Sequence, residues 1–203
     1  SEMPWCLVEV PSLTVETITY LYLVNNAQSD DEKLLHMQNY LKTLRANIFS
    51  GSADAELERY MRTNLREGKI LDVETVSDFV QNLDKENTIL PKFDEAKYNW
   101  MCDGHFFSTY YNYNYSLDML IACYFAQKIY AGDEKILNDF ITLMENGGSK
   151  KTMDLLSDSG IDLLSDKIYD EAFAFFENTL NDFVALSERV KENNAASKTQ
   201  VNK

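Results

Sequence analysis

Glycine and proline are scarce in this sequence, which contains only 7 Gly and 3 Pro among 203 residues. These two residues interrupt helices more than any others, so their scarcity favours helical structure. Hydrophobic residues make up 45% of the chain. This share argues against a disordered protein, because a disordered chain cannot bury enough apolar surface to offset its ordering entropy. The sequence has no internal repeat and no convincing strand, and we predict an all-α fold.

Basic charge is also scarce, because 19 Lys and Arg stand against 33 Asp and Glu, which gives a net charge of -14. A surface that neutralises phosphates needs the opposite balance, so nucleic acid and anionic membranes are poor candidate partners. An acidic balance is common in soluble cytosolic enzymes, where repulsion keeps the chains apart. The balance does not identify a substrate.

The cysteines form no recognisable framework. Cys6, Cys102 and Cys123 make neither a C-x-x-C pair nor an even set for disulfides. A reducing compartment is the simplest interpretation, and we expect a cytoplasmic protein. The apolar stretch Met119–Phe125 is too short to cross a bilayer. No basic region precedes the apolar N-terminal residues, as it would in a cleavable signal peptide.

Apolar residues recur at helical spacing along most of the chain. The pattern predicts a short helix that stops at Gly160 and longer helices at 14–24, 34–48, 53–65, 73–83, 116–130, 134–144 and 167–190. Ser12 is the expected N-cap of the first helix. We expect a loop at Asn87–Lys92 and an irregular aromatic segment at Trp100–Tyr115.

Glu9 and Glu16 are two acids in an otherwise apolar segment. If this segment is helical, a spacing of seven puts both carboxylates on one face, two turns apart. Acids in such a segment are costly to bury unless a cation or a set of donors satisfies them, and a metal ion would do so. On spacing alone the more frequent explanation is a pair of ordinary acids at a helix start, where the helix dipole favours them.

His105 opens the densest tyrosine cluster of the sequence, formed by Tyr110, Tyr111, Tyr113 and Tyr115. Tyrosine hydroxyls and an imidazole N–H are donors that could stabilise an oxyanion as it forms. The alternative on spacing alone is a packed aromatic core with its hydroxyls at the rim.

Other parts of a catalytic site are missing. The sequence has no H-E-x-x-H motif and no other pair of histidines at ligand spacing. Catalytic zinc normally takes three protein ligands, and this chain does not supply two histidines near Glu9. A serine or cysteine triad is poorly supported, because nothing marks His36 or His105 as the partner of a nucleophile.

Several short segments occur in an order that is informative as a set. They are Glu9-Val10-Pro11-Ser12 through Glu16, Asn47-Ile48-Phe49, Glu56-Leu57-Glu58, Tyr98-Asn99-Trp100, His105-Phe106-Phe107, Tyr110 through Tyr115, Gly147-Gly148-Ser149, and Leu155-Leu156 before Gly160-Ile161-Asp162. Together they resemble the thimet oligopeptidase and oligoendopeptidase F family, and the oligoendopeptidase F branch most closely. The match reaches about residue 187. We therefore expect the helical C-terminal part of a peptidase catalytic domain at 1–187. At 188–203 we expect a polar tail, in which the last helix ends and the chain is then disordered.

The resemblance implies a zinc metalloendopeptidase that hydrolyses short peptides with a zinc-activated water. It implies that Glu9 is a zinc ligand and that Glu16 is a nearby acid that orients the site from outside the ligand sphere. His105, Tyr111 and Tyr113 are implied as donors that hold the substrate backbone and stabilise the tetrahedral intermediate. Which tyrosine donates to the oxyanion stays open.

The two zinc histidines and the catalytic glutamate of the family would lie upstream of this chain's first residue. We therefore expect the chain alone to be inactive and to hold no zinc by itself. Its expected partners are an oligopeptide substrate and the N-terminal part of the same enzyme, which carries H-E-x-x-H. The alternative is a non-catalytic helical module that binds a partner chain or peptide through an exposed cleft. Both predict that apolar residues such as Trp5, Leu7 and Val8 lack neighbours and form an exposed patch, and they differ in whether Glu9 completes a zinc site.

Overall fold

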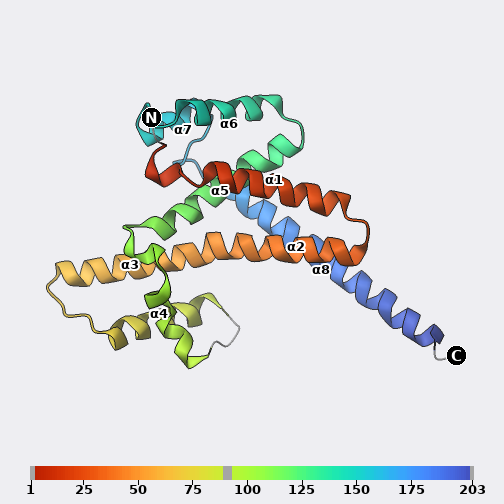
Figure 1. The fold of residues 1–203 in the computed structure, drawn as a ribbon, viewed down its shortest axis with the longest axis horizontal. Helices are drawn as coiled ribbons and strands as arrows, with labels where there is room; N and C mark the ends of the chain where they lie inside the picture. The colour runs from red at the N-terminus through yellow and green to blue at the C-terminus, as the bar shows by residue number, and fades with distance from the viewer. Residues whose placement is uncertain (1–2, 89–92, 202–203) are drawn as a thin grey trace.

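In the computed structural model, which describes residues 3–88 and 93–201, the chain forms helices and no strands within those ranges (Figure 1). The α-helices are α1 (Val10–Asn26), α2 (Asp30–Arg45), α3 (Gly51–Arg66), α4 (Val73–Asn87), α5 (Tyr111–Tyr130), α6 (Glu134–Asn146), α7 (Thr152–Asp158) and α8 (Asp166–Val201). Shorter 3-10 segments are η1 (Trp5–Leu7), η3 (Asp94–Cys102) and η4 (His105–Phe107), and η2 (Ala46–Ser50) is a π-helical segment. The predicted all-α fold is confirmed, and each predicted helix is present.

The start of α1 differs from the prediction. The helix begins at Val10, and its N-cap is Glu9 rather than Ser12. Pro11 falls in the first turn, where its missing N–H breaks no helical hydrogen bond. Ser12 lies inside the helix, and its hydroxyl donates to the backbone oxygen and to the Oε2 of Glu9.

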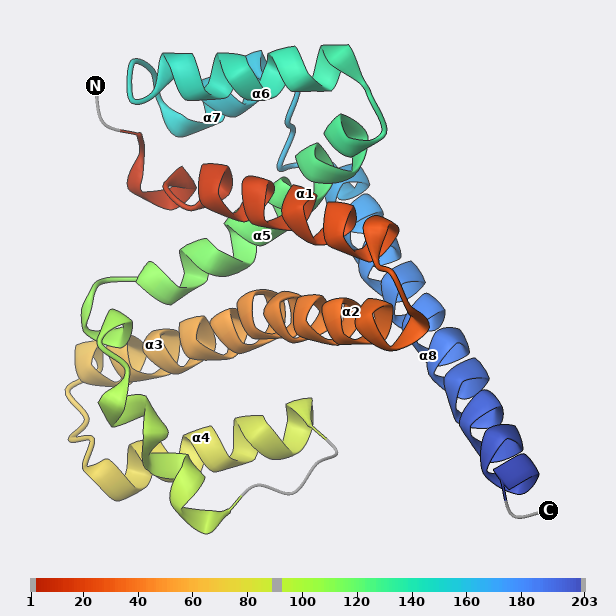
Figure 2. The same ribbon diagram turned by 45° about the vertical axis from the view of Figure 1, so that its right-hand side comes forward.

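Other boundaries also move. Helix α2 begins at Asp30 rather than at residue 34, and α4 ends at Asn87 rather than at residue 83. Helix α5 begins at Tyr111, about one turn before the predicted start at residue 116. Helix α8 continues past the predicted end near Val190 to Val201, and its last part extends away from the other helices (Figures 1 and 2). In the predicted loop Asn87–Lys92, residues 89–92 lie outside the described residues.

Helix α5 is the centre of the fold. It passes between α1 and α2 in both views (Figures 1 and 2), and every residue from 116 to 126 is buried. A helix that is apolar on all sides is stable only when other elements surround it. The apolar stretch Met119–Phe125 is therefore a core segment of a helix that packs against α1, α3, α6 and α8.

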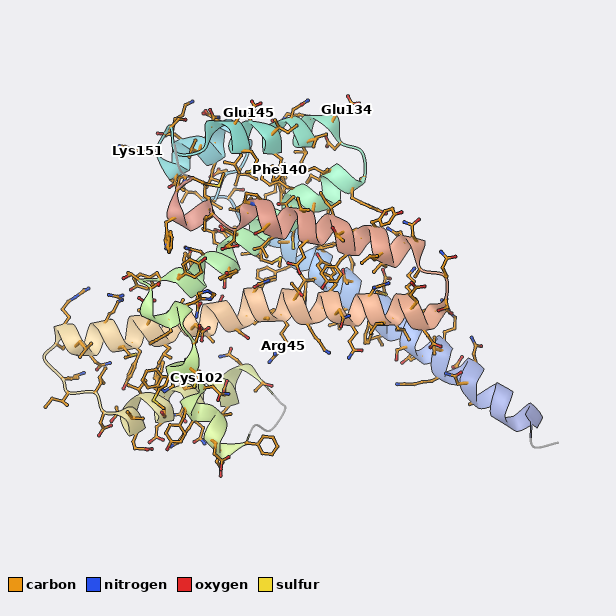
Figure 3. The ribbon with its side chains drawn as sticks, in the orientation of Figure 1. Arg45, Cys102, Glu134, Phe140, Glu145 and Lys151 are labelled. Carbon is orange, nitrogen blue, oxygen red and sulfur yellow. The ribbon has the colours of Figure 1, made fainter. Side chains whose placement is uncertain are left out.

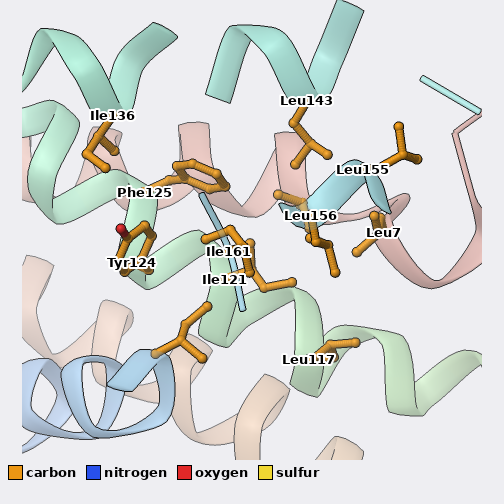
Figure 4. Close-up of a cluster of buried hydrophobic side chains, with 12 residues drawn as sticks. Leu7, Leu117, Ile121, Tyr124, Phe125, Ile136, Leu143, Leu155, Leu156 and Ile161 are labelled. Atoms are coloured by element: carbon orange, nitrogen blue, oxygen red, sulfur yellow. The ribbon is translucent and has the colours of Figure 1, made fainter. Parts of the chain in front are cut away.

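Two hydrophobic clusters meet on α5. The first joins it to η1, α1, α6, α7 and the start of α8, and consists of Leu7, Val10, Leu117, Ile121, Tyr124, Phe125, Ile136, Leu143, Leu155, Leu156, Ile161 and Ile168 (Figure 4). The second joins α5 to α1, α2, η2 and α8, and consists of Leu13, Tyr40, Leu44, Ile48, Met119, Leu120, Ala122, Cys123 and Ala172. Because α5 and α1 contribute to both clusters, their relative position is fixed from two sides.

Helix α6 covers the end of α5 remote from the site described below. Phe140 points from α6 toward α5, where its ring meets that of Phe125 at 5.3 Å, whereas Glu134 and Glu145 lie on the outer side (Figure 3). At the opposite end of the molecule, α4 and η3 pack beside α3. Tyr60 of α3 stacks on Phe79 of α4 at 3.9 Å.

Helices α2 and α3 form one continuous rod that is interrupted by the π segment η2 (Figure 1). A π turn disturbs the regular hydrogen bonding of a helix. The Ser116 hydroxyl of α5 approaches the carbonyl oxygens of Asn47 at 2.8 Å and Ile48 at 3.1 Å. Gly51 makes this approach possible, since a Cβ there would lie 2.6 Å from the Ser116 Oγ and 2.9 Å from the backbone oxygen of Asn112.

The segment Trp5–Asn26 has 22 residues and is long and apolar enough to cross a membrane, because an 18-residue stretch within it has a mean hydropathy of 1.2. Core helices of soluble proteins have the same length and hydropathy, so these two properties do not identify a membrane span. Leu7, Val10 and Leu13 of this segment are buried against the rest of the protein. The expectation of exposure holds for Trp5 and Val8 but is wrong for Leu7, which packs into the first hydrophobic cluster.

Replacing Gly51 with Ala should destabilise the chain, because the added Cβ meets a backbone oxygen that cannot move alone. We expect a loss of about 1–3 kcal/mol in the free energy of unfolding, measured by urea denaturation. Gly104→Ala is the matched control, since its φ is -62° and nothing lies within 4 Å of its Cβ. The control should change the free energy by less than about 0.5 kcal/mol. A Gly51→Ala protein as stable as the original would show that α5 can move away from η2.

A candidate active site at the start of helix α5

Glu9 lies where η1 turns into α1, and its half-buried carboxylate is held by two hydroxyls. Its Oε1 accepts a hydrogen bond from the Tyr111 hydroxyl at 2.9 Å, across a sequence separation of 102 residues. Its Oε2 accepts one from the Ser12 hydroxyl at 3.0 Å. Both donors are neutral, and no ion pair of the described residues involves Glu9. The carboxylate is therefore oriented but not neutralised.

His105 lies against the tyrosines of α5. Its ring centroid is 4.7 Å from that of Tyr111 and 5.8 Å from that of Tyr115. Tyr111 and Tyr115 are four residues apart, so they share one face of the helix, and their rings meet edge to face at 5.6 Å. Trp5 of η1 packs against Tyr111 at 4.9 Å. The structure thus brings three of the predicted residues, Glu9, His105 and Tyr111, into one cluster.

The two tyrosine hydroxyls of this cluster remain protonated at neutral pH. The hydrogen bond to the Glu9 carboxylate raises the pKa of Tyr111 above its usual value. Burial is the main cause that raises the pKa of Tyr115. Both hydroxyls therefore carry a proton, and Tyr111 donates its proton to the Glu9 carboxylate.

Tyr113 does not join the cluster. It lies two residues after Tyr111, which places it on another side of the helix. It is 46% exposed and lines a pocket of about 690 Å³ together with Trp5, Tyr110 and Asn114. The described contacts do not connect it to Glu9 or His105.

Glu16 lies two turns beyond Glu9 on α1 and is half-buried. It lines a shallow pocket with Ser12, and Ser12 in turn donates to Glu9. Burial raises the pKa of Glu16. The spacing of seven therefore places Glu16 along the same helix face as Glu9, with Ser12 between them.

Asp118 of α5 holds the start of α1 in place and was missed by the sequence analysis. Its carboxylate is fully buried, and its Oδ2 accepts the backbone N–H of Glu9 at 2.9 Å. The first N–H groups of a helix have no partner within the helix, so an acceptor from α5 satisfies one of them. Burial raises the pKa of Asp118 to about 8. The available signal was a single acid inside the apolar run from Leu117 to Ala122.

Glu58 of α3 holds the start of α5, which the sequence analysis also missed. Both of its carboxylate oxygens accept the backbone N–H of Tyr110, at 3.0 and 2.8 Å. Tyr110 has a φ of 53°, the one positive value among the non-glycine residues that the structure describes. This left-handed conformation costs about 1–2 kcal/mol for a residue with a Cβ. The hydrogen bond from Tyr110 to a buried carboxylate offsets such a cost.

The described residues contain no group of three His, Cys, Asp or Glu side chains that could hold a metal ion. Glu9 by itself has the properties of one ligand, because its oxygens face only neutral donors. Zinc in catalytic sites takes three protein ligands, so the residues present fit a part of such a site.

The model of peptidase family M3 matches residues 1–175 of this chain. The chain belongs to peptidase family M3. The oligopeptidase PepF of Bacillus subtilis (strain 168) is 26% identical over 190 residues, and the match covers 92% of this chain and 28% of that protein. An oligoendopeptidase F homolog of Lactococcus lactis subsp. lactis (strain IL1403) is 24% identical, with 93% and 32% covered.

This M3 chain also has the fold of a solved oligoendopeptidase F structure. The crystal structure of oligoendopeptidase F from Enterococcus faecium superimposes with a TM-score of 0.81 at 25% identity, over 91% of this chain and 36% of that one. The resemblance inferred from the ordered motifs is confirmed. The chain spans about a third of the length of these curated relatives.

Replacing Asp118 with Ala should destabilise the M3 chain, because the buried N–H of Glu9 loses its acceptor. We expect the free energy of unfolding to fall by about 1–3 kcal/mol, measured by urea denaturation at pH 7. Asp118→Asn is the matched variant, since its amide oxygen can accept the same N–H, and it should retain most of the stability. Equal losses in the two variants would show that the hydrogen bond contributes nothing to the position of α1.

Proposed function

We propose that the chain is the helical C-terminal part of the catalytic domain of a zinc oligopeptidase, and that the complete enzyme hydrolyses short peptides. The observation that carries this proposal is the hydrogen bond from Tyr111 to Glu9, with the His105 ring packed against the Tyr111 ring. A candidate metal ligand and candidate carbonyl donors meet there although they are far apart in the sequence. The relatives are named as oligopeptidases and oligoendopeptidases, which supports the substrate class.

In this proposal Glu9 holds zinc together with two histidines of the N-terminal part of the enzyme. Bound zinc supplies a Lewis acid that activates a water molecule and polarises the peptide carbonyl. Glu16 orients the Glu9 side of the site from a position further along α1. The Ser12 hydroxyl holds the Glu9 carboxylate, and the hydrogen bond from the Glu9 backbone N–H to Asp118 fixes the start of the helix that carries it.

His105 and a tyrosine are proposed to donate hydrogen bonds to the substrate carbonyl as it gains negative charge. Tyr111 is the better candidate for the oxyanion donor, because its hydroxyl lies 2.9 Å from the carboxylate that would bind the metal. Its single O–H would turn from Glu9 to the substrate once a metal ion occupied that carboxylate. Tyr113 faces an open pocket and is proposed to hold the substrate backbone.

The chain supplies one zinc ligand and no general base, so we propose that it is inactive alone. Its partner is the N-terminal part of the same enzyme, with the H-E-x-x-H motif. Trp5, Val8 and Val15 are exposed apolar residues of η1, its C-cap and α1, and offer a surface for that partner. A cytoplasmic location without nucleic-acid or membrane partners agrees with the net charge of -14.

Zinc affinity tests the role of Glu9. In the complete enzyme, Glu9→Gln should lower zinc affinity by about 10²-fold or more, because it removes a direct ligand. Zinc content after dialysis against a chelator gives the measurement, with the surface variant Glu145→Gln as control. The 203-residue chain alone should bind no zinc at micromolar concentration in native mass spectrometry. Zinc retained by Glu9→Gln, or bound tightly by this chain alone, would contradict the proposal.

Turnover distinguishes the two tyrosines. In the complete enzyme, Tyr111→Phe should lower kcat by about 10²-fold with a smaller change in KM, because an oxyanion donor acts mainly in the transition state. Tyr113→Phe should mainly raise KM. Both values come from steady-state kinetics with a fluorogenic oligopeptide. If Tyr113→Phe lowers kcat and Tyr111→Phe mainly raises KM, Tyr113 is the oxyanion donor. Unchanged kinetics in both variants would show that neither tyrosine takes part in the mechanism.

A further inference from the structure

The turn from η4 into α5 passes through a backbone conformation that bulky residues rarely adopt. Tyr110, the N-cap of α5, has φ 53° and ψ 29°. This turn follows His105 by a few residues and ends where Tyr111 begins the helix, so it determines whether the His105 ring can lie on Tyr111. Such a conformation persists only where the surrounding structure holds it.

Glu58 is the group that holds it. The side chain projects from α3 and is buried, with an exposed fraction of 7%. Its two oxygens enclose the Tyr110 N–H, and Arg62 donates from its Nε to the Glu58 Oε1 at 2.7 Å. A backbone N–H held by an ionised acceptor is among the stronger hydrogen bonds in proteins.

Arg62 extends this contact along the turn. Its second guanidinium nitrogen donates to the hydroxyl of Thr109 at 3.2 Å, and its guanidinium lies 5.1 Å from the ring centre of Tyr110. The acid and the base of α3 therefore contact two successive residues of the turn. Neither Glu58 nor Arg62 contacts Glu9 or His105 directly in the described structure, so any effect on the site passes through the backbone of the turn.

Glu56, two residues before Glu58 on α3, has a different partner. Glu56 forms an exposed ion pair with Arg59 one turn further along α3. The two glutamates of Glu56-Leu57-Glu58 are thus chemically identical and two residues apart, but only Glu58 contacts the turn. Glu56 is a natural control position.

We propose that Glu58 is a positioning residue, whose carboxylate holds the left-handed turn at Tyr110 and thereby sets the orientation of His105 over Tyr111. The functional part of this inference rests on the proposed peptidase function, since it is there that His105 and Tyr111 act on the substrate. The structural part concerns this chain alone and is tested on it directly.

The chain contains only two histidines, which makes the test direct. In the 203-residue protein with isotope-labelled histidine, NMR should give one set of imidazole signals for each. The rings of Tyr111 and Tyr115 lie 4.7 and 5.8 Å from the His105 ring, so their ring currents should displace the His105 signals. His36 lies on α2 beside Glu32 and serves as an internal reference.

In Glu58→Gln, the His105 signals should move toward those of a free imidazole while the His36 signals stay in place. The Tyr110 amide should exchange with solvent roughly tenfold faster, because it loses a charged acceptor. Glu56→Gln should change neither the His105 signals nor the exchange rate. Unchanged His105 signals in Glu58→Gln overturn the inference.

A double variant separates positioning from general stability. Glycine adopts the left-handed conformation without strain, so Glu58→Gln combined with Tyr110→Gly should restore the turn and return the His105 signals toward their original positions. If Glu58 only stabilised α3, removing the Tyr110 side chain could not restore them. His105 signals that stay displaced in the double variant contradict the inference.

Kinetics of the complete enzyme then distinguish this inference from the proposed function. If both are correct, Glu58→Gln lowers kcat more than it raises KM, and Tyr110→Gly partly rescues it. If the His105 signals move but kcat does not, Glu58 positions His105 as inferred, and the proposed catalytic role of His105 and Tyr111 is wrong.

Discussion

The packing of α1 against α5 is the contact on which the arrangement of the candidate site depends. It brings the Glu9 carboxylate to the hydroxyl of Tyr111, 102 residues later. The two hydrophobic clusters hold α1 and α5 together on either side of this contact. Within this contact, Asp118 accepts the backbone N–H of Glu9. Hydrophobic packing is not directional, whereas this hydrogen bond sets the register of α1 along α5.

The site is fixed by two buried carboxylates that each accept a backbone N–H at the start of a helix. Asp118 acts from α5 on α1, and Glu58 acts from α3 on α5. Isolated charges are costly to bury, so each arrangement must compensate for its acid. Glu58 does so with Arg62 as an ion-pair partner. Asp118 has no such partner among the described ion pairs, and its raised pKa of about 8 reflects burial without a cation.

Local patterns were sufficient to predict the fold. The helical spacing of apolar residues predicted each helix, and the order of short motifs predicted the family. The errors occurred where a long-range contact replaced a local signal. Ser12 was expected to cap α1, but the acceptor comes from Asp118, 109 residues after the helix start. Helix α5 begins early because Glu58 accepts the N–H of its N-cap, 52 residues away.

The same reasoning explains which site residues could be found. Glu9, His105 and Tyr111 were implied by resemblance, and the structure places them together. Neither Glu58 nor Asp118 carries a sequence pattern that reveals its role, because what matters is the backbone group that each one meets. A helix cap is normally recognised from residues next to it, and here both caps come from other helices.

The surroundings of Glu9 favour the enzyme interpretation over a purely structural helical module. A half-buried carboxylate with only a structural role is expected to pair with a cation or to be replaced by an apolar residue, since either avoids the cost of its desolvation. Glu9 instead receives hydrogen bonds from two neutral hydroxyls, which fix its direction without cancelling its charge. Asp118 beside it has a pKa raised to about 8 by burial, so it is largely neutral at pH 7 and the charge at this point is that of Glu9. In the proposed function, a metal ion held jointly with the rest of an M3 peptidase would compensate this charge and has the required ligand chemistry.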